Sequence, residues 1–160
     1  MSSIYEIIEC KRLRRKVRAI ITNERGEFLL IQPHSYEKDT WTLVGGGVEN
    51  GESYEQAVIR EITEETGIDK IVSIQLSEAQ HWFCFSEKIK TQRKLDYDGQ
   101  VAKIFWVVVP NKSVITLQKE EVRSYCWAQP NEVLDLIKVL KQKELVKSVI
   151  REMYELKKAA

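Results

Sequence analysis

The sequence predicts a mixed α/β fold in which a sheet and helices pack as layers. Short apolar runs separated by turns come first, one capped helix follows, and further strand-like and helix-like segments fill the rest of the chain. The longest apolar run, 104–109, is too short to span a bilayer and is typical of a strand buried on both faces. We expect one domain over residues 1–160, because this length can bury a core and 43% of the residues are hydrophobic.

The first part of the chain predicts a hairpin and a short third strand. Apolar, β-branched runs at 17–22 and 28–31 flank a turn that contains Gly26. A further short strand at 41–44 leads into the only glycine cluster of the chain, residues 45–47. The glycines therefore fall between this strand and the helix that follows.

That helix is predicted at 53–66. Ser53 fits its N-cap, and Gln56 three residues later completes a capping box. Apolar side chains then recur every four residues, which gives the helix one apolar stripe. Gly67 follows as a C-terminal stop.

The second half of the chain predicts more strands and then helices. The predicted strands are 71–76, 81–85, 101–109 and 124–127. Residues 131–160 carry helical periodicity and are expected to form C-terminal helices. Residues 1–16 are expected to form a basic N-terminal extension, which either is simply solvated or reaches a polyphosphate or RNA.

Composition and charge exclude several classes of protein. Lys and Arg number 25 and Asp and Glu 24, so the net charge of +1 excludes a global polybasic or polyacidic mode of binding. No segment resembles a membrane span or a secretory signal, so we expect no membrane partner and a cytoplasmic location. The cysteines Cys10, Cys84 and Cys126 are widely separated and odd in number, which favours reduced thiols.

Three glutamates of the predicted helix are candidate ligands for a metal ion. Glu61, Glu64 and Glu65 have spacings that place them on one helix face, where their like charges repel. Arg60 supplies a positive charge only at the edge of this face. A hard divalent cation such as Mg²⁺ would compensate better, because it prefers oxygen ligands. The alternative is an exposed, solvated acidic face without function.

The segment around these glutamates resembles the signature of the Nudix hydrolase family, G-x5-E-x7-R-E-U-x-E-E-x-G-U, in which U is a bulky aliphatic residue. Every fixed position of the signature is met. The matching residues are Gly46, Glu52, Arg60, Glu61, Glu64, Glu65 and Gly67, with Ile62 and Ile68 as the aliphatic residues. From average residue usage, a chance match at one starting position is on the order of 10⁻⁹.

The resemblance implies a Nudix-type mixed sheet sandwiched between helices. It also implies Mg²⁺-dependent hydrolysis of a nucleoside diphosphate linked to another group, with Mn²⁺ as a substitute metal. Glu61, Glu64 and Glu65 then correspond to metal-binding and catalytic residues, and the carbonyl of Gly45 completes the metal site. The motif residues to which the resemblance gives a structural role are Gly46, Glu52, Arg60 and Gly67.

One further catalytic residue is expected outside the signature. Many members of the family place an acidic ligand or base on a loop ahead of a late tryptophan. Here Glu121 fits that place best, ahead of Trp127, and Glu120 fits it second best. The alternative for Glu121 is a solvated loop carboxylate.

The substrate class is less clearly marked. Gln100 and Lys103 lead into an aromatic-rich strand, and this pattern resembles the branch of the family that acts on dinucleoside polyphosphates or RNA 5′-pyrophosphate. Val44 stands where proline is more common, both in that branch and in members that act on free nucleotides. Nucleoside triphosphates and other nucleotide conjugates therefore stay as alternative substrates. The candidate substrate-binding residues are Arg18, Trp41, Tyr97, Gln100 and Lys103.

A non-catalytic nucleotide-binding or RNA-binding module is the alternative from another functional class. Loss of catalysis in the family usually shows as broken glutamates in the signature, and here all of them are intact. The sequence therefore favours an enzyme, and we expect it to act as a monomer or a homodimer.

Overall fold

The computed structural model describes residues 12–160. Residues 1–11, which include Cys10 and most of the expected basic extension, lie outside the described residues. The strands are β1 (Leu13–Asn23), β2 (Phe28–Pro33), β3 (Val44–Gly47), β4 (Ser73–Cys84), β5 (Gly99–Val109) and β6 (Val122–Ala128). The helices are α2 (Tyr54–Thr66), α3 (Glu87–Arg93), α4 (Val133–Leu136) and α5 (Leu140–Ala159).

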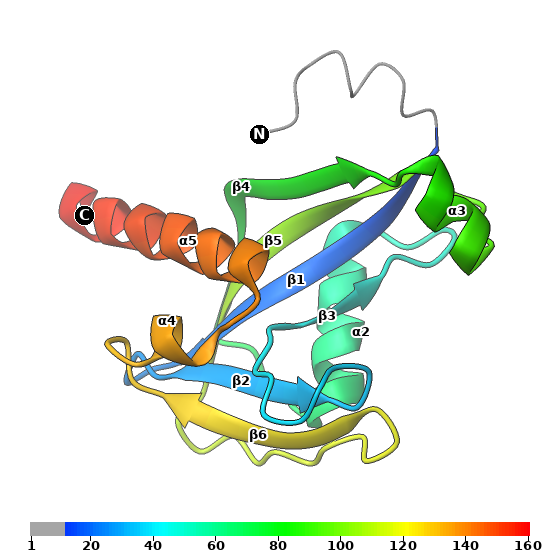
Figure 1. Cartoon of the computed structure of the whole chain (residues 1–160). Helices are drawn as coiled ribbons and strands as arrows, with labels where there is room; N and C mark the ends of the chain where they lie inside the picture. The colour runs from blue at the N-terminus through cyan, green and yellow to red at the C-terminus, as the bar shows by residue number, and fades with distance from the viewer. Residues whose placement is uncertain (1–11) are drawn as a thin grey trace.

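The six strands form one mixed sheet, with the order β4-β5-β1-β2-β6 and with β3 paired to β1 (Figure 1). β1 runs parallel to β5 over its whole length, from Leu13 opposite Gly99 to Asn23 opposite Val109. The other strand pairs of residues 12–160 are antiparallel. A mixed sheet is what the sequence predicts, and this prediction is confirmed.

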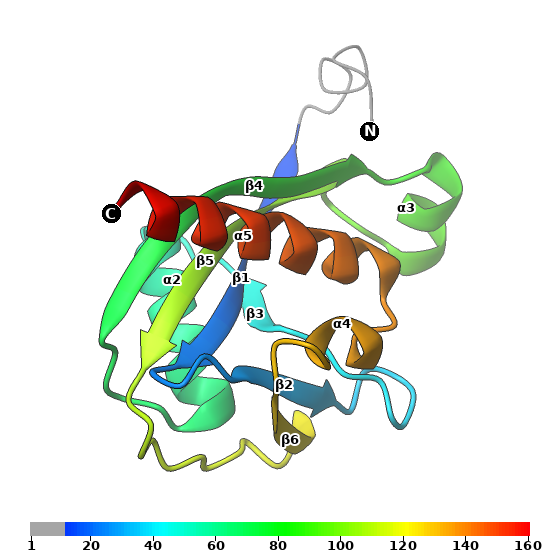
Figure 2. The same cartoon turned by 90° about the vertical axis from the view of Figure 1, so that its left-hand side faces the viewer.

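Helices cover the sheet on both faces. α2 lies on one face and α5 on the other, as the two perpendicular views show (Figures 1 and 2). Alternate residues of each strand point to opposite faces, so β1 contributes Ala19 and Ile21 to the core under α2 and Ile20 to the core under α5. The expected sandwich of a sheet between helices is therefore confirmed.

β1 changes its neighbour on one edge partway along its length, and this change positions the glycine cluster. Its middle residues pair with β3, from Lys16 opposite Gly47 to Ala19 opposite Val44. Near its end it pairs with β2, with Thr22 opposite Phe28. The glycine backbone thus lies directly beside the basic part of β1.

α2 forms as its sequence predicts. The Ser53 hydroxyl accepts a hydrogen bond from the backbone N–H of Gln56, and the Gln56 side chain accepts one from the backbone N–H of Ser53. Gly67 ends the helix at φ 73°, a left-handed conformation that favours glycine. The apolar side of the helix, with Val58 and Ile62, is fully buried against the sheet.

Several strand boundaries differ from the prediction. β1 begins at Leu13 and not at residue 17, because the consecutive basic residues Arg14, Arg15 and Lys16 give its first part no hydrophobic pattern. β3 begins at Val44 rather than at Trp41, since the ladder uses the backbone of the glycines, and Thr42 makes only an isolated bridge to Ile31.

The region after α2 also differs. The two predicted strands 71–76 and 81–85 are one strand, β4, with an irregularity between Leu76 and Gln80 that hides its continuity in the sequence. Glu152 of α5 holds this irregularity through Ser77 and through the backbone N–H of Glu78. α3 was not predicted, because it is short and buries none of its side chains.

The state of the cysteines differs in part from the prediction. Cys84 is disulfide-bonded, so the expectation of reduced thiols is wrong for this residue, whereas Cys126 is free. Distance along the chain does not predict which cysteines meet in space. None of the helices between residues 12 and 160 has the length and apolar character needed to cross a membrane.

Candidate active site

Arg60 neutralises part of the charge of two of the three glutamates of α2. Its guanidinium contacts Glu61 at 2.9 Å and the more exposed Glu64 at 3.1 Å. Arg60 also makes a two-point pair with Glu52, at 2.8 and 3.1 Å, and this pair holds the pKa of Glu52 below its usual value. The sequence placed Arg60 at the edge of the acidic face, and there it reaches both the helix and the preceding loop.

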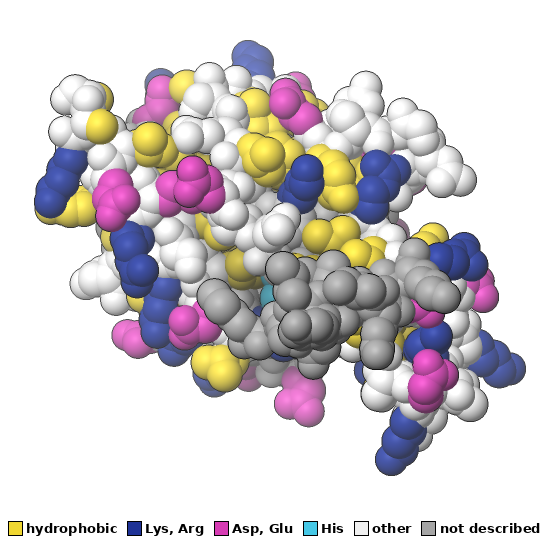
Figure 3. Space-filling view, turned by 90° about the horizontal axis from the view of Figure 1, so that it is seen from above, with side chains coloured by type: hydrophobic (Ala, Val, Ile, Leu, Met, Phe, Trp, Pro, Cys, Tyr) yellow, Lys and Arg dark blue, Asp and Glu magenta, His cyan; other side chains and the backbone are white. Residues whose placement is uncertain are grey.

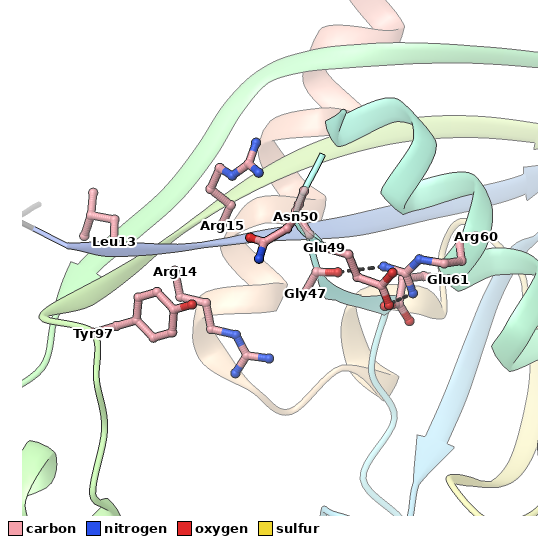
Figure 4. A pocket seen from close by; sticks show the side chains of 10 residues that line it. Leu13, Arg14, Arg15, Gly47, Glu49, Asn50, Arg60, Glu61 and Tyr97 are labelled. Carbon is pink, nitrogen blue, oxygen red and sulfur yellow. Dashed lines mark hydrogen bonds and ion pairs between the residues drawn. The ribbon is translucent and has the colours of Figure 1, made fainter. Parts of the chain in front are cut away.

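Arg60 fixes the glycine loop against the helix. One of its N–H groups donates to the carbonyl of Gly47 at 2.8 Å, in addition to the contacts with Glu52. Figure 4 shows Arg60 and Glu61 next to Gly47, with the contacts of Arg60 to the Gly47 carbonyl and to Glu61 drawn as dashed lines. A planar guanidinium with several fixed donors suits such a bridging role. The contacts support the structural role that the resemblance gives to Glu52 and Arg60.

At two positions of the glycine cluster, neighbouring atoms leave no room for a Cβ atom. A Cβ atom at Gly46 would collide with the carboxylate of Glu61, and one at Gly45 would collide with the backbone carbonyl of Val17. The backbone N–H of Gly45 donates to the carboxylate of Glu65 at 3.3 Å. The absence of side chains at these positions therefore lets the helix carboxylates approach the strand backbone.

The site is electrostatically strained without a cation. Burial and, next, the nearby charge of Glu61 raise the pKa of Glu65 to about 7, against the opposing effect of the hydrogen bond from the N–H of Gly45. Burial also raises the pKa of Glu61, against the opposing effect of Arg60. The charge of Glu121 contributes to both shifts. The fold thus brings a loop carboxylate into the field of the helix carboxylates.

Glu121 lies beside Glu65 as the sequence predicts. Glu65, Glu120 and Glu121 line a pocket of about 240 Å³ together with His34. Glu121, and not Glu120, is among the main charges that shift the pKa values of Glu61 and Glu65. The electrostatics therefore favour Glu121 over Glu120 as the additional carboxylate.

The carboxylates of the site are of the kind that binds a hard divalent cation, but their side chains do not converge on one point. In the part of the chain that the structure describes, no three acidic, histidine or cysteine side chains are grouped so that they could hold one ion as they stand. Glu61 and Glu64 instead engage Arg60. Mg²⁺ prefers oxygen ligands such as these carboxylates. A bound cation would also offset the mutual repulsion that raises their pKa values. Metal would bind through Glu61, Glu64, Glu65, Glu121 and the Gly45 carbonyl, as the resemblance implies.

A polar pocket of about 480 Å³ adjoins Glu61 on its other side (Figure 4). Arg14 and Tyr97 lie on one side of β1 in this view, and Arg15 lies on the other. Arg60, Glu61 and the backbone of Gly47 form its inner end. The pocket thus joins arginine side chains to the acidic site, which suits an anionic ligand.

The candidate substrate-binding residues separate into two groups. Arg18 lies against Gly45, Gln100 pairs across the sheet with Arg14, and Tyr97 lines the polar pocket. Lys103, by contrast, faces α2, where its ammonium lies 4.4 Å from the ring centroid of Tyr54. Trp41 packs against the core under α5. The structure therefore brings Arg18, Gln100 and Tyr97 to one end of the sheet and leaves Lys103 on the opposite face.

Sequence reasoning did not give His34 a role, and it treated Arg14 and Lys16 only as part of the basic run. Lys16 is half-buried between Arg14 and Arg18, and burial with these two charges lowers its pKa to about 8. His34 contacts the loop that carries Glu121. The alternation Arg14, Lys16, Arg18 was the available signal, because residues two apart on a strand share a face.

Comparison with known proteins agrees with this geometry. The family model for the NUDIX domain matches residues 12–152. An RNA pyrophosphohydrolase of Nitratiruptor sp. is 35% identical over 119 residues, which cover 71% of this chain and 75% of that protein. The nucleoside triphosphatase NudI of Escherichia coli O139:H28 is 36% identical over 100 residues, which cover 59% of this chain and 64% of NudI.

The fold also matches solved structures. A binary complex of the C. elegans Ap4A hydrolase superposes with a TM-score of 0.67 and 21% identity, over 89% of this chain and 99% of that one. The chain belongs to the Nudix family, and it is a Nudix hydrolase with pyrophosphohydrolase activity. Members of this family generally use divalent metal cations.

Proposed function

We propose that the chain is an Mg²⁺-dependent RNA pyrophosphohydrolase, which removes pyrophosphate from the 5′-triphosphate end of an RNA. The observation that carries this proposal is the row of basic side chains, Arg14, Lys16 and Arg18, beside the glutamates. No ion pair satisfies these three cations among residues 12–160. A polyphosphate would satisfy them, and the burial that lowers the pKa of Lys16 adds to the gain from binding an anion.

Different residues of the chain have different roles in this reaction. The basic row binds and orients the polyphosphate, and Arg60 keeps the glycine loop in place. Glu121 or a helix glutamate accepts a proton from the attacking water. The α–β anhydride bond breaks, pyrophosphate leaves, and the RNA keeps a 5′-monophosphate. A bound divalent cation supplies charge neutralisation and a lower pKa for a bound water.

Hydrolysis of free nucleoside triphosphates is the second candidate. The sequence similarity to NudI favours it, although that match covers less of this chain than the match to the RNA pyrophosphohydrolase. Dinucleoside polyphosphates are a third class that the sequence pattern allows. All three present an anionic polyphosphate to the same basic row, so the substrate has to be decided by comparison of rates.

The test is a competition among substrates. Purified protein with Mg²⁺ is given a 5′-triphosphorylated oligoribonucleotide, the four nucleoside triphosphates and diadenosine tetraphosphate, and kcat/KM is measured for each. We expect the highest kcat/KM for the RNA, with pyrophosphate and 5′-monophosphorylated RNA as products. Glu65→Gln serves as the inactive control and should lower turnover by about 10²-fold or more. A higher kcat/KM for a free nucleotide would replace the RNA assignment by the second candidate.

A further inference from the structure

Two basic side chains of the sheet meet at one aromatic ring of α2. Arg15 of β1 and Lys103 of β5 lie on the same face of the sheet as α2, because Val17, two residues after Arg15 and opposite Lys103, belongs to the core under α2. The guanidinium carbon of Arg15 lies 5.5 Å from the ring centroid of Tyr54, and the ammonium of Lys103 lies 4.4 Å from it. We call these three side chains the Tyr54 cluster.

The ring compensates two cations that have no carboxylate partner. Neither Arg15 nor Lys103 forms an ion pair within residues 12–160. Strand register makes them diagonal neighbours, about 8 Å apart, where like charges repel each other. The face of a tyrosine ring is negative and attracts a cation. Tyr54 therefore offsets a repulsion that would otherwise push the two basic side chains apart.

The cluster lies between the core and the surface. Tyr54 and Lys103 are half-buried, and Tyr54 packs against the core under α2, whereas Arg15 is exposed. Neighbours of the same kinds are visible from above, where Lys and Arg side chains lie against hydrophobic side chains in the upper right part of the molecule (Figure 3). A ring that packs on the core and also contacts two cations is held from several directions, so it can fix the start of α2.

The loop before α2, residues 48–53, is attached to the sheet through this cluster. Tyr54 is the first residue of α2 and directly follows the loop. The backbone N–H of Val48, the first residue of the loop, donates to the carbonyl of Arg15 at 2.9 Å. Arg15 thus contacts one end of the loop with its backbone and the other end with its side chain. Residues 49–51 between these ends are exposed.

The same loop holds part of the candidate active site. Arg60 binds Glu52 of the loop and the carbonyl of Gly47, which directly precedes the loop. The pKa of Glu52 is lowered first by Arg60 and also by the charge of Arg15, so the cluster lies within electrostatic reach of this pair. Arg60 in turn contacts Glu61 at 2.9 Å. A shift of the loop would therefore move the groups that position Glu61.

We infer that Tyr54 is a positioning residue for hydrolysis, because its ring binds the two cations and so keeps the loop before α2 against the sheet. The loop in turn keeps Arg60 and Glu61 in place. This role needs an aromatic ring and not merely an apolar side chain. Tyr54 and Lys103 are not among the residues that line the polar pocket beside Glu61, so their substitution should lower kcat and leave KM nearly unchanged. The inference holds for any nucleotide substrate and does not depend on the RNA assignment.

Replacement of the ring separates this role from apolar packing. Tyr54→Phe keeps the ring and should keep kcat within about twofold of the wild type. Tyr54→Leu keeps an apolar side chain but loses both cation–π contacts, and it should lower kcat by about fivefold. The rates are measured at saturating Mg²⁺ with the substrate that has the highest kcat/KM among the three classes. A Phe variant as slow as the Leu variant, or wild-type kcat in the Leu variant, would overturn the inference.

Lys103 tests the cationic side of the contact. Lys103→Met keeps most of the length of the side chain without its charge, and it should lower kcat by about twofold to threefold. The double variant with Tyr54→Leu should be no slower than Tyr54→Leu alone, because the contact is already lost there. Effects that multiply, as they do for independent sites, would contradict the role of the ring as the partner of Lys103.

Amide hydrogen exchange reports on the loop directly, without metal or substrate. The Val48 N–H, which donates to Arg15, should exchange about fivefold faster in Tyr54→Leu and at the wild-type rate in Tyr54→Phe. The N–H of Ile31 donates to the carbonyl of Thr42 at 3.0 Å elsewhere in the sheet, and it should exchange at the wild-type rate in both variants. Equal acceleration at both amides would show a general loss of stability and would overturn the positioning role.

α5 offers a matched control pair. The ammonium of Lys158 lies 4.7 Å from the ring centroid of Tyr154. Tyr154→Leu and Lys158→Met remove the same kind of contact and should leave kcat, KM and the exchange of Val48 unchanged. Losses there as large as those at Tyr54 would also overturn the inference. Melting temperatures identify any variant that fails to fold, and if Tyr54→Leu does so, Lys103→Met decides. If the wild type hydrolyses none of the substrates, the proposed function fails, and the exchange measurement alone decides whether Tyr54 holds the loop.

Discussion

Glu65 is the residue at which burial and like charge act most clearly together. Its pKa is raised to about 7 by burial, with a further contribution from Glu61. Between pH 4.5 and about 7, Glu65 therefore binds more protons in the folded protein without metal than in the unfolded chain. The contribution of Glu65 to the free energy of unfolding then falls as the pH rises through this window.

Substitution of Glu65 tests this linkage. In the presence of EDTA, the melting temperature of the wild type should decrease between pH 5 and pH 8, and Glu65→Gln should reduce this decrease because it removes one of the titrating carboxyls. The measurement is thermal unfolding followed by circular dichroism at several pH values. Equal pH slopes for the two proteins would show that Glu65 titrates in the folded state much as it does in the unfolded chain.

Glu121 and Glu120 form a second comparison at the scale of single residues. Both are exposed and line the same pocket, but Glu121 is the one whose charge raises the pKa values of Glu61 and Glu65. Glu121→Gln should lower kcat by about 10-fold or more, while Glu120→Gln should change it much less. Steady-state kinetics with saturating Mg²⁺ measures both. The opposite ranking would assign the role to Glu120, and no effect of either would place the base on α2.

At the scale of elements, the loop before β6 is held by the end of β2. The backbone N–H of His34 donates to the carbonyl of Glu121 at 2.8 Å. The His34 ring nitrogen Nε2 lies 3.0 Å from the carbonyl of Lys119, which can only accept, so Nε2 carries the hydrogen and donates a hydrogen bond there. These two contacts fix the loop on both sides of Glu120, and they make His34 a positioning residue for Glu121.

The side-chain contact of His34 can be removed without loss of the backbone one. His34→Ala should lower kcat by about fivefold with little change in KM, since one net hydrogen bond is worth about 1 kcal/mol. His34→Gln can still donate to the Lys119 carbonyl and should restore most of the rate. A Gln variant as slow as the Ala variant would argue against the positioning role, as would wild-type kcat in both.

Elements that are specified by residues within their own segment were predictable from the sequence. The capping box at Ser53 and the stop at Gly67 specify α2 locally, and the uninterrupted apolar run specifies most of β5. β3 was misplaced because its ladder is made by glycine backbone, which has no side-chain pattern. β4 was divided in two because its irregularity is held by Glu152, a contact between segments far apart in the chain.

The same distinction applies to the site. Helical spacing places the glutamates of α2 on one face, and the family resemblance points to Glu121; the structure places Glu121 near Glu65, and the catalytic roles of these residues stay predictions. Lys103 was expected with Gln100 near the substrate, yet residues three apart on a strand face opposite sides, and Lys103 packs on Tyr54. The position of Arg14, Lys16 and Arg18 beside the glycines depends on the register of β1 against β3, which no local pattern contains.

At the scale of the whole molecule, the acidic site joins parts of the fold that are far apart in the sequence. α2 supplies Glu61 and Glu65, β3 supplies Gly45, and the loop before β6 supplies Glu121. Without metal, the burial of Glu61 and Glu65 and the repulsion among these carboxylates oppose folding, and both effects raise the pKa values of Glu61 and Glu65. A divalent cation would both relieve this repulsion and bind only the folded chain, because the unfolded chain does not bring its ligands together.

Divalent metal should therefore raise the melting temperature of the intact protein. At a hundredfold excess over its Kd, a ligand of the folded state adds about 2.7 kcal/mol, and a domain of this size gains about 2–4 °C for each kcal/mol. We expect a shift of about 5–10 °C with Mg²⁺ or Mn²⁺, reversed by EDTA and much smaller in Glu65→Gln. Glu144→Gln, which removes an exposed glutamate paired with Lys147 on α5, is the matched control and should keep the full shift. If sodium at equal ionic strength gave the same shift as Mg²⁺, the glutamates of α2 would be a solvated surface and not a metal site.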